Sequence, residues 1–402
     1  MTKGIHLIDR AIALTDALIA FPTISTDSNL AMIAYLEMQL MEMGAVIEKT
    51  QDDTGTKANL FATIGPDIDG GIVLSGHTDV VPVEGQEWSS DPFEMVQRDG
   101  KLFGRGACDM KGFIACALAV GPVLAAGKLA RPLHFAFTYD EETGCLGAGR
   151  MLSALRESGR RPAVCLIGEP TEMRVVEGHK GCVENTTRFT GLEGHGSVPS
   201  AGVNAVEYAV RYVSELMDIA EALKPRAPAQ SRFEPPWTTV NIGALRGGVA
   251  HNVIPNIAEV EWEFRPVNEA DKSFVYQRIN QFTDEILLPQ MQATFAEASI
   301  ETENIGDVCG LEPMAHSEAV ALAQQLTGGN SAHCVPFGTE AGLFQALGIS
   351  TAICGPGSIT EAHKPDEFVE ISQMVKCLDM LLGLGNKLAE MPRSAQTTGP
   401  LA

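Results

Sequence analysis

The sequence is poor in positive charge and in long apolar segments. Lys and Arg together number 29 against 51 Asp and Glu, which gives a formal net charge of -22. Such a charge repels a phosphate backbone or an anionic membrane surface, so we expect neither nucleic acid nor a membrane as a partner. We find no stretch long enough to span a bilayer, and the first apolar segment is interrupted by Asp9, Arg10 and Asp16. That pattern predicts an amphipathic helix rather than a signal peptide.

The sequence also lacks paired cysteine motifs. Its nine cysteines are an odd number and contain no CxxC spacing. This usage argues against a disulfide framework and favours reduced thiols in a cytosolic protein. Cys116, Cys165 and Cys354 lie in apolar runs, so we expect them in the core.

The length of 402 residues predicts two domains, since a single core of that size is unusual. Helical spacing covers residues 5–20 and 28–43, and short strand patterns follow them at 45–49 and 59–64. Four further runs are short, continuous and apolar, and each ends in Gly or a polar residue: 71–76, 132–138, 162–168 and 350–355. Such runs are typical of strands buried on both faces. We therefore predict an α/β domain whose mixed sheet is covered by helices on both faces.

The middle of the chain has a different pattern, with the order β-α-β-β-α-β. The expected elements lie at residues 182–190, 204–223, 238–242, 257–264, 272–287 and 298–303. This order predicts a separate two-layer α+β domain inserted into the first. The predicted division is 182–303 for the inserted domain, and 1–181 with 304–402 for the domain that carries the chemistry.

Acidic and imidazole side chains follow each of the four buried runs. In open α/β sheets the ligand lies beyond the carboxyl ends of the strands, so these positions are the first candidates for a site. The residues are His77 and Asp79 after the first run, Asp140, Glu141 and Glu142 after the second, Glu169 after the third, His363 after the fourth, and Asp109 before an apolar helix.

Carboxylates gathered at one edge repel each other unless a cation lies among them. Imidazole and carboxylate ligands suit Zn, Co or Mn, and a dinuclear centre with one bridging carboxylate accommodates the set. Asp79 lies two residues beyond His77, so its carboxylate can accept a hydrogen bond from the ring nitrogen that does not bind metal. Each residue alone has a structural alternative, such as a helix cap for Asp109 or a charged turn for Glu141 and Glu142. Their coincidence at strand ends favours the metal site.

Five segments resemble a known family: SGHTDVVP, GRGACDMKG, DEETGCLG, IGEPTE and AHKPDEFV. In this order they are similar to the signatures of the dinuclear zinc aminoacylase and carboxypeptidase family, and they span nearly the whole chain. The resemblance implies a zinc-exopeptidase-like catalytic domain with two divalent ions per chain, zinc or else cobalt. It places His77 and Glu169 on one ion, Glu142 and His363 on the other, and Asp109 between them.

The same resemblance assigns the catalytic groups. Glu141 becomes the general base that takes a proton from the attacking water and passes it to the leaving amine. The segment GLEGHGSVPSAGVNAVE is similar to the family's ferredoxin-like dimerisation domain, in which a histidine enters the partner subunit's active site and stabilises the oxyanion. The matching residue is His195, which implies a homodimer.

Further segments resemble the family's substrate contacts. The implied residues are Asn252, Arg265, Gly338, Thr339, Glu340, Gly355 and Ser358. GTEAGLF with CGPGSITEAHKPDEF is most similar to acetylornithine deacetylases, which implies hydrolysis of N2-acetyl-L-ornithine in arginine biosynthesis. Three alternatives remain open: desuccinylation of succinyl-diaminopimelate, another deacylase or carboxypeptidase activity of the family, and a non-catalytic binding protein that retains the fold.

Overall fold

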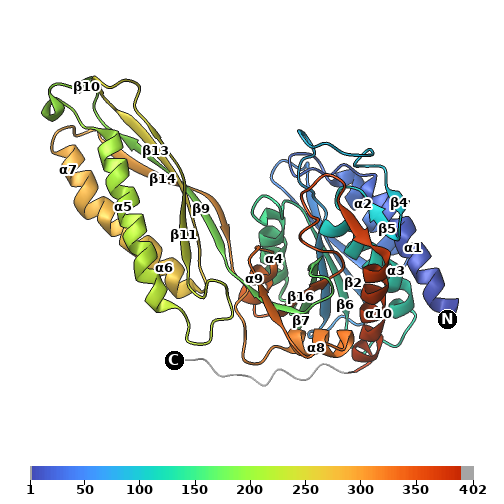
Figure 1. Cartoon of the computed structure of the whole chain (residues 1–402). Coiled ribbons are helices and arrows are strands. Elements are labelled where there is room, and N and C mark those ends of the chain that lie inside the picture. The colour runs from blue at the N-terminus through green and yellow to red at the C-terminus, as the bar shows by residue number, and fades with distance from the viewer. Residues whose placement is uncertain (1, 391–402) are drawn as a thin grey trace. The chain divides into compact units, whose positions relative to one another are not determined.

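The structure is a computed structural model that describes residues 2–390 (Figure 1). It divides into two compact units. The first contains the residues up to Glu177, Pro313–His333 and the residues from Thr339 onward, and the second contains Gly178–Glu312 and Cys334–Gly338. The predicted fold class, a mixed α/β sheet flanked by helices with a second α+β unit, is confirmed.

The first unit is built on an eight-stranded sheet with the order β1-β2-β6-β3-β7-β16-β8-β15. Its strands are β1 (Val46–Gln51), β2 (Ala58–Ile64), β3 (Ile72–His77), β6 (Leu133–Thr138), β7 (Val164–Pro170), β8 (Val176–His179), β15 (His333–Val335) and β16 (Ser350–Gly355). The four adjacent strands β6, β3, β7 and β16 are parallel, and they are the four predicted apolar runs. Their carboxyl ends therefore meet at one edge of the sheet.

Helices cover both faces of this sheet (Figure 1). They are α1 (Thr2–Ile19), α2 (Leu30–Met41), α3 (Gly112–Ala125), α4 (Leu146–Ser158), α8 (Glu318–Thr327), α9 (Ala341–Ala346) and α10 (Ile371–Leu388). A helical turn, η1 (Ala107–Lys111), precedes α3, and a small sheet of β4 (Val96–Arg98), β5 (Lys101–Phe103) and β17 (Phe368–Glu370) accompanies it. Alternate residues of β3 separate the two faces: Gly76 lies against α3, whereas Ser75 contacts the start of α9.

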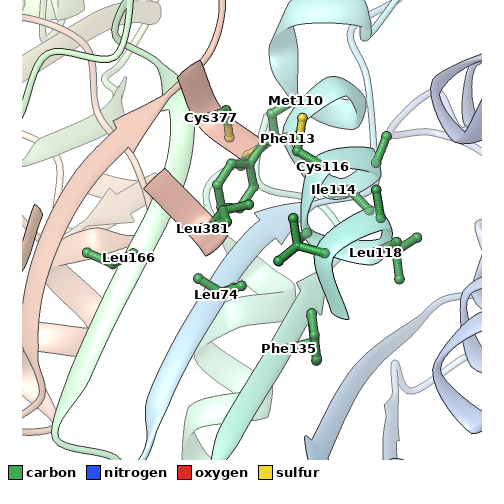
Figure 2. Packing of buried hydrophobic residues seen from close by; sticks show 14 of the residues in the cluster. Leu74, Met110, Phe113, Ile114, Cys116, Leu118, Phe135, Leu166, Cys377 and Leu381 are labelled. Carbon is green, nitrogen blue, oxygen red and sulfur yellow. The ribbon is translucent and has the colours of Figure 1, made fainter. Parts of the chain in front are cut away.

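The core of the first unit centres on α3. Figure 2 shows Phe113, Ile114 and Leu118 of this helix among Leu74, Phe135 and Leu166 of the strands, with Cys377 and Leu381 of α10 beside them. Gly168 of β7 permits this close packing, because a Cβ at that position would lie 1.9 Å from Cγ of Phe113. Cys116, Cys165 and Cys354 are fully buried free thiols, as predicted.

One expectation about apolar segments needs correction. The segment Ala107–Ala125, formed by η1 and α3, is long and apolar enough to cross a membrane, with a mean hydropathy of 1.5. However, 89% of it is buried inside the protein, so it serves as a core helix. The sequence alone does not indicate this length, because Asp109 and Lys111 interrupt the apolar run.

The second unit has an antiparallel four-stranded sheet with the order β11-β13-β9-β14. Its main elements are β9 (Cys182–Thr190), α5 (Ala205–Leu223), β11 (Thr239–Gly247), β13 (Ile257–Arg265), α6 (Glu269–Phe282), η4 (Thr283–Leu287), α7 (Leu288–Gln292) and β14 (Ser299–Val308). Alternate residues of β13 from Ala258 to Phe264 are buried against the helices. Short elements connect them: β10 (Gly194–His195), η2 (Pro199–Ala201), η3 (Lys224–Arg226) and β12 (Val253–Ile254).

Candidate metal centre

The predicted ligands gather at the carboxyl ends of the parallel strands of the first unit. His77 is the last residue of β3, and Glu169 is the next-to-last residue of β7. Glu141 and Glu142 follow β6, and Asp109 is held in η1 before α3. His363 reaches the same group from the loop after β16. Residues that are up to 286 positions apart in the numbering thus form one cluster because the strands are parallel.

Asp109 lies between the two histidines. Its Oδ1 is 2.9 Å from Nε2 of His77, and its Oδ2 is 3.3 Å from Nε2 of His363. Each imidazole has a second carboxylate nearby: Oε1 of Glu169 is 3.9 Å from His77, and Oε1 of Glu142 is 3.1 Å from His363. The two oxygens of one carboxylate therefore face two separate histidine–carboxylate pairs.

Two sets of ligand atoms are close enough to share a cation. One is His77, Glu141 and Glu169, and the other is His77, Asp109 and Glu142, with the atoms of each set within 4.8 Å of one another. Glu141, the predicted general base, belongs to the first set. Distances alone therefore do not distinguish a metal ligand from the general base. His363 is the most accessible member, with a side chain 50% exposed.

The charges of the cluster depend strongly on one another. Burial raises the pKa of Glu169 and of Glu141 well above the ordinary value for glutamate. Hydrogen bonds with Asp109 and Glu142 raise the pKa of His363 to about 10. Burial alone would lower the pKa of His77, but the neighbouring carboxylates, first Asp109 and then Asp79, outweigh it and the pKa is raised. The acids thus favour any positive charge among them, whether protons or metal ions.

The donor set fits a pair of divalent cations. Two imidazoles and several carboxylates are the ligands that Zn²⁺, Co²⁺ and Mn²⁺ accept. Oε1 of Glu169 is buried and has no hydrogen-bond partner among residues 2–390. A buried carboxylate oxygen normally has such a partner, and a metal ion would take its place.

Asp79 contacts the site differently from the predicted geometry. Nδ1 of His77 is 2.9 Å from the backbone oxygen of Asp79 but 3.6 Å from its carboxylate. The carboxylate instead accepts hydrogen bonds from the Ser25 hydroxyl at 2.7 Å and from the backbone N–H groups of Glu141 and Glu142 at 3.1 and 3.3 Å. Asp79 therefore links the His77 strand end to the loop that carries both glutamates.

The remaining acid of this loop points away from the cluster. Both oxygens of Asp140 accept hydrogen bonds from Nζ of Lys57, at 2.6 and 2.7 Å. Glu367, which is not among the predicted site residues, lies closer to the cluster than Asp140 does. The carboxylate of Glu367 accepts a hydrogen bond from the backbone N–H of Asp109 at 3.1 Å. The segment AHKPDEFV contained this signal, but only His363 was selected from it.

The predicted substrate residues of the first unit are mainly buried. Thr339 and Glu340 are 0% and 1% exposed. The Glu340 carboxylate accepts hydrogen bonds from Ser75 and, at 2.8 Å, from Thr138. Gly355 packs against the Gly168 backbone, where a Cβ would lie 2.0 Å from the carbonyl oxygen, and Ser358 O is 3.6 Å from Sγ of Cys108.

The other predicted residues belong to the second unit. His195 in β10 pairs with Val253 in β12, next to Asn252, and its exposed ring contacts the Ser197 hydroxyl at 2.7 Å. Arg265 ends β13 and pairs with Glu263 of the same strand at 3.1 Å. The structure thus brings His195 and Asn252 together within this unit. Gly338 is also assigned to the second unit.

Comparisons with known proteins identify the family. The model of Peptidase family M20/M25/M40 matches residues 73–387. Acetylornithine deacetylase from Proteus mirabilis is 36% identical over 362 residues, which cover 88% of this chain and 90% of that protein.

Solved structures share the fold. Aminopeptidase PepT from Bacillus cereus has a TM-score of 0.72 at 18% identity and covers 95% of this chain and 99% of its own. A dinuclear metal-binding peptidase of the M20 family from Bacillus subtilis has a TM-score of 0.66 at 17% identity, covering 96% and 99%. The family match extends over most of the sequence and includes all the residues of the cluster. This chain belongs to Peptidase family M20/M25/M40.

Proposed function

We propose that this chain is a metal-dependent amidohydrolase that cleaves N2-acetyl-L-ornithine into L-ornithine and acetate. The observation that carries the proposal is the Asp109 carboxylate, whose two oxygens face His77 and His363 with Glu141 beside them. The choice of substrate follows the Proteus mirabilis relative, which is 36% identical over 88% of this chain.

Two divalent ions, zinc or cobalt, are the proposed cofactors. His77 with Glu169 would hold one, Glu142 with His363 would hold the other, and Asp109 would contact both. When bound, the ions supply a Lewis acid that polarises the scissile carbonyl. The pairing is supported by the distances from each histidine to its own glutamate and to a different oxygen of Asp109.

Glu141 is the proposed general base. Its carboxylate takes one proton from the attacking water as the water oxygen bonds to the amide carbon. It then gives that proton to the amine nitrogen as the C–N bond breaks. The Asp79 carboxylate supports this role, because it fixes the backbone N–H of Glu141 while the Asp79 carbonyl orients His77. Asp79 thereby ties the base to a ligand.

The second unit is the proposed dimerisation and lid domain, and the enzyme is a homodimer. The partner subunit's His195 would donate a hydrogen bond to the developing oxyanion. An exposed imidazole, fixed by Ser197 and adjacent to Asn252, is suited to such a contact. Asn252 and Arg265 would contact the substrate. The guanidinium group of Arg265 would bind the α-carboxylate of the substrate.

The turn before α9 and the loop after β16 complete the proposed pocket. Its residues are Gly338, Thr339, Glu340, Gly355 and Ser358. We place the reaction in arginine biosynthesis and the enzyme in the cytoplasm. The free thiols of residues such as Cys116 and Cys165 agree with that reducing compartment.

Initial rates on a panel of substrates test the function. The panel holds N2-acetylornithine, N-acetylmethionine, N-succinyl-diaminopimelate and a dipeptide, each assayed with zinc or cobalt. We expect the highest kcat/KM for N2-acetylornithine, and turnover lower by about 10²- to 10⁴-fold in the Glu141→Gln control purified in parallel. Preference for another member of the panel would correct the substrate, and no turnover of any member by metal-loaded protein would contradict the enzymatic proposal.

A further inference from the structure

A buried ion pair lies next to the proposed ligands without belonging to them. Arg105 and Glu367 are each 1% exposed, and Nη1 of Arg105 donates to Oε2 of Glu367 at 2.8 Å. Removing two charges from water costs as much as or more than their attraction returns, so a buried pair is a poor stabilising device by itself. We therefore consider which backbone segments the two side chains hold in place.

Glu367 fixes the turn that carries Asp109. Its Oε1 accepts hydrogen bonds from the backbone N–H groups of Cys108 and Asp109 at 3.0 and 3.1 Å, and its Oε2 accepts one from Gly106 at 3.0 Å. Asp109 and Met110 have non-helical backbone angles, so η1 is not a regular helical turn. One carboxylate thus supplies the acceptors for the irregular backbone that aims Asp109 at the histidines.

Arg105 holds the loop that carries His363. Its Nη1 also donates to the backbone oxygen of Lys364 at 3.3 Å, and its Nη2 donates to Oε1 of Gln86 at 2.6 Å. Nε2 of Gln86 in turn donates to the backbone oxygen of His363 at 2.9 Å. His363 has a φ of +61°, a conformation that costs a non-glycine residue energy and persists only where its surroundings impose it.

We propose that Arg105, Glu367 and Gln86 form a positioning element for the second metal site, the one assigned to Glu142 and His363. The element sets the separation of Asp109 from His363 without touching an ion. The inference rests on the proposed dinuclear centre.

The first site does not depend on this element for its histidine. His77 is the last residue of the central strand β3, and its Nδ1 contacts the backbone oxygen of Asp79. Loosening the element should therefore weaken the binding of one ion more than the other. A general loss of stability would weaken both.

Two variants and one control test the proposal. Glu367→Gln keeps the shape of the side chain but replaces one acceptor oxygen by an NH₂ group that faces donors. Gln86→Glu keeps an acceptor for Arg105 but replaces the donor to the His363 oxygen by a negatively charged carboxylate oxygen. Arg131→Gln is the control: Arg131 is 7% exposed and donates to the Gly70 oxygen at 2.7 Å, at the amino end of β3.

The measurement is a titration of metal-free protein with Co²⁺, followed by visible absorption and by bound cobalt per chain. We expect two binding steps in the wild type and in the control. In Gln86→Glu the second step weakens about 10- to 100-fold while the first keeps its affinity. In Glu367→Gln the shared Asp109 is loosened as well, so both steps weaken, the second more than the first. Excess Co²⁺ should restore most of kcat in both variants.

Three results would overturn the inference. They are unchanged affinities in both variants, equal weakening of both steps in Gln86→Glu, and a second step in Gln86→Glu as tight as in the wild type. Gln86→Glu decides the matter if Glu367→Gln does not fold. A wild type that binds fewer than two ions would instead refute the proposed dinuclear centre, so the two failures are distinguishable.

Discussion

Replacing Glu141 by glutamine should separate proton transfer from metal binding. Among residues 2–390 the Glu141 carboxylate has one hydrogen-bond partner, Sγ of Cys145 at 3.7 Å. Its backbone N–H is held by Asp79, and the substitution leaves that bond in place. The variant should therefore keep the loop and both ions but lose the group that accepts the proton.

The size of the effect follows from the role. A positioned general base contributes about 10²- to 10⁴-fold to the rate, which corresponds to about 3 to 5 kcal/mol in the activation free energy. Gln has nearly the same shape and removes a half-buried carboxylate that is surrounded by other acids. We expect the free energy of unfolding to change by roughly 1 kcal/mol or less.

The neighbouring residue offers a matched control. Oε1 of Glu142 is 3.1 Å from Nε2 of His363, so Glu142→Gln removes a proposed ligand from the same loop. Bound metal per chain and kcat on N2-acetylornithine are measured for both variants. Glu141→Gln should keep two ions and lose activity, whereas Glu142→Gln should lose an ion. Metal loss in Glu141→Gln, or a kcat within tenfold of the wild type, would refute the reasoning.

Three further predictions follow from other contacts. Asp79→Asn should lower kcat about 10- to 100-fold, because the single oxygen of the amide cannot accept from Ser25 and from the N–H groups of both Glu141 and Glu142. A kcat equal to that of the wild type would speak against this role. Burial lowers the pKa of His134 to about 3, against about 6.5 when unfolded, so the unfolded chain binds more protons between these pH values and stability rises with pH across them. In urea unfolding at pH 5 and pH 7, His134→Gln should reduce the difference in unfolding free energy by about 2 kcal/mol, and an unchanged difference would contradict the assignment. Removing the metal with a chelator should abolish turnover and lower Tm, because the acids crowded around Asp109 then repel one another. An unchanged Tm would show that the ions do not offset that repulsion.

The parallel strands could be predicted from the sequence because each is a continuous apolar run. β3, β6, β7 and β16 begin and end within two residues of the predicted ranges. Once such strands are aligned in parallel, the polar residues that follow them must meet at one edge. The proximity of His77, Glu142, Glu169 and His363 follows from that arrangement, whereas Asp109 joins them from η1.

Contacts that depend on the packing of distant loops could not be predicted. Glu367 meets the backbone of Asp109 across 258 positions of the chain, and no local pattern indicates this hydrogen bond. The sequence also places Glu340 at a helix start but does not show that Ser75 and Thr138 enclose it. Its predicted contact with substrate stays a prediction.

Local geometry was missed for a different reason. Two-residue periodicity puts the Asp79 side chain on the same side as His77 but cannot show which of its oxygens meets the imidazole. The structure has the backbone oxygen there, because the carboxylate is used by the glutamate loop. Strands of two to four residues, such as β8 and β15, are too short to show periodicity.

A crystal structure of the zinc-loaded protein, with anomalous scattering measured at the zinc edge, tests the central claim most directly. We predict two anomalous peaks per chain, both within about 2 Å of an Asp109 oxygen. One should also contact His77 and Glu169, and the other Glu142 and His363. A single peak, or two peaks that do not share Asp109, would contradict the account.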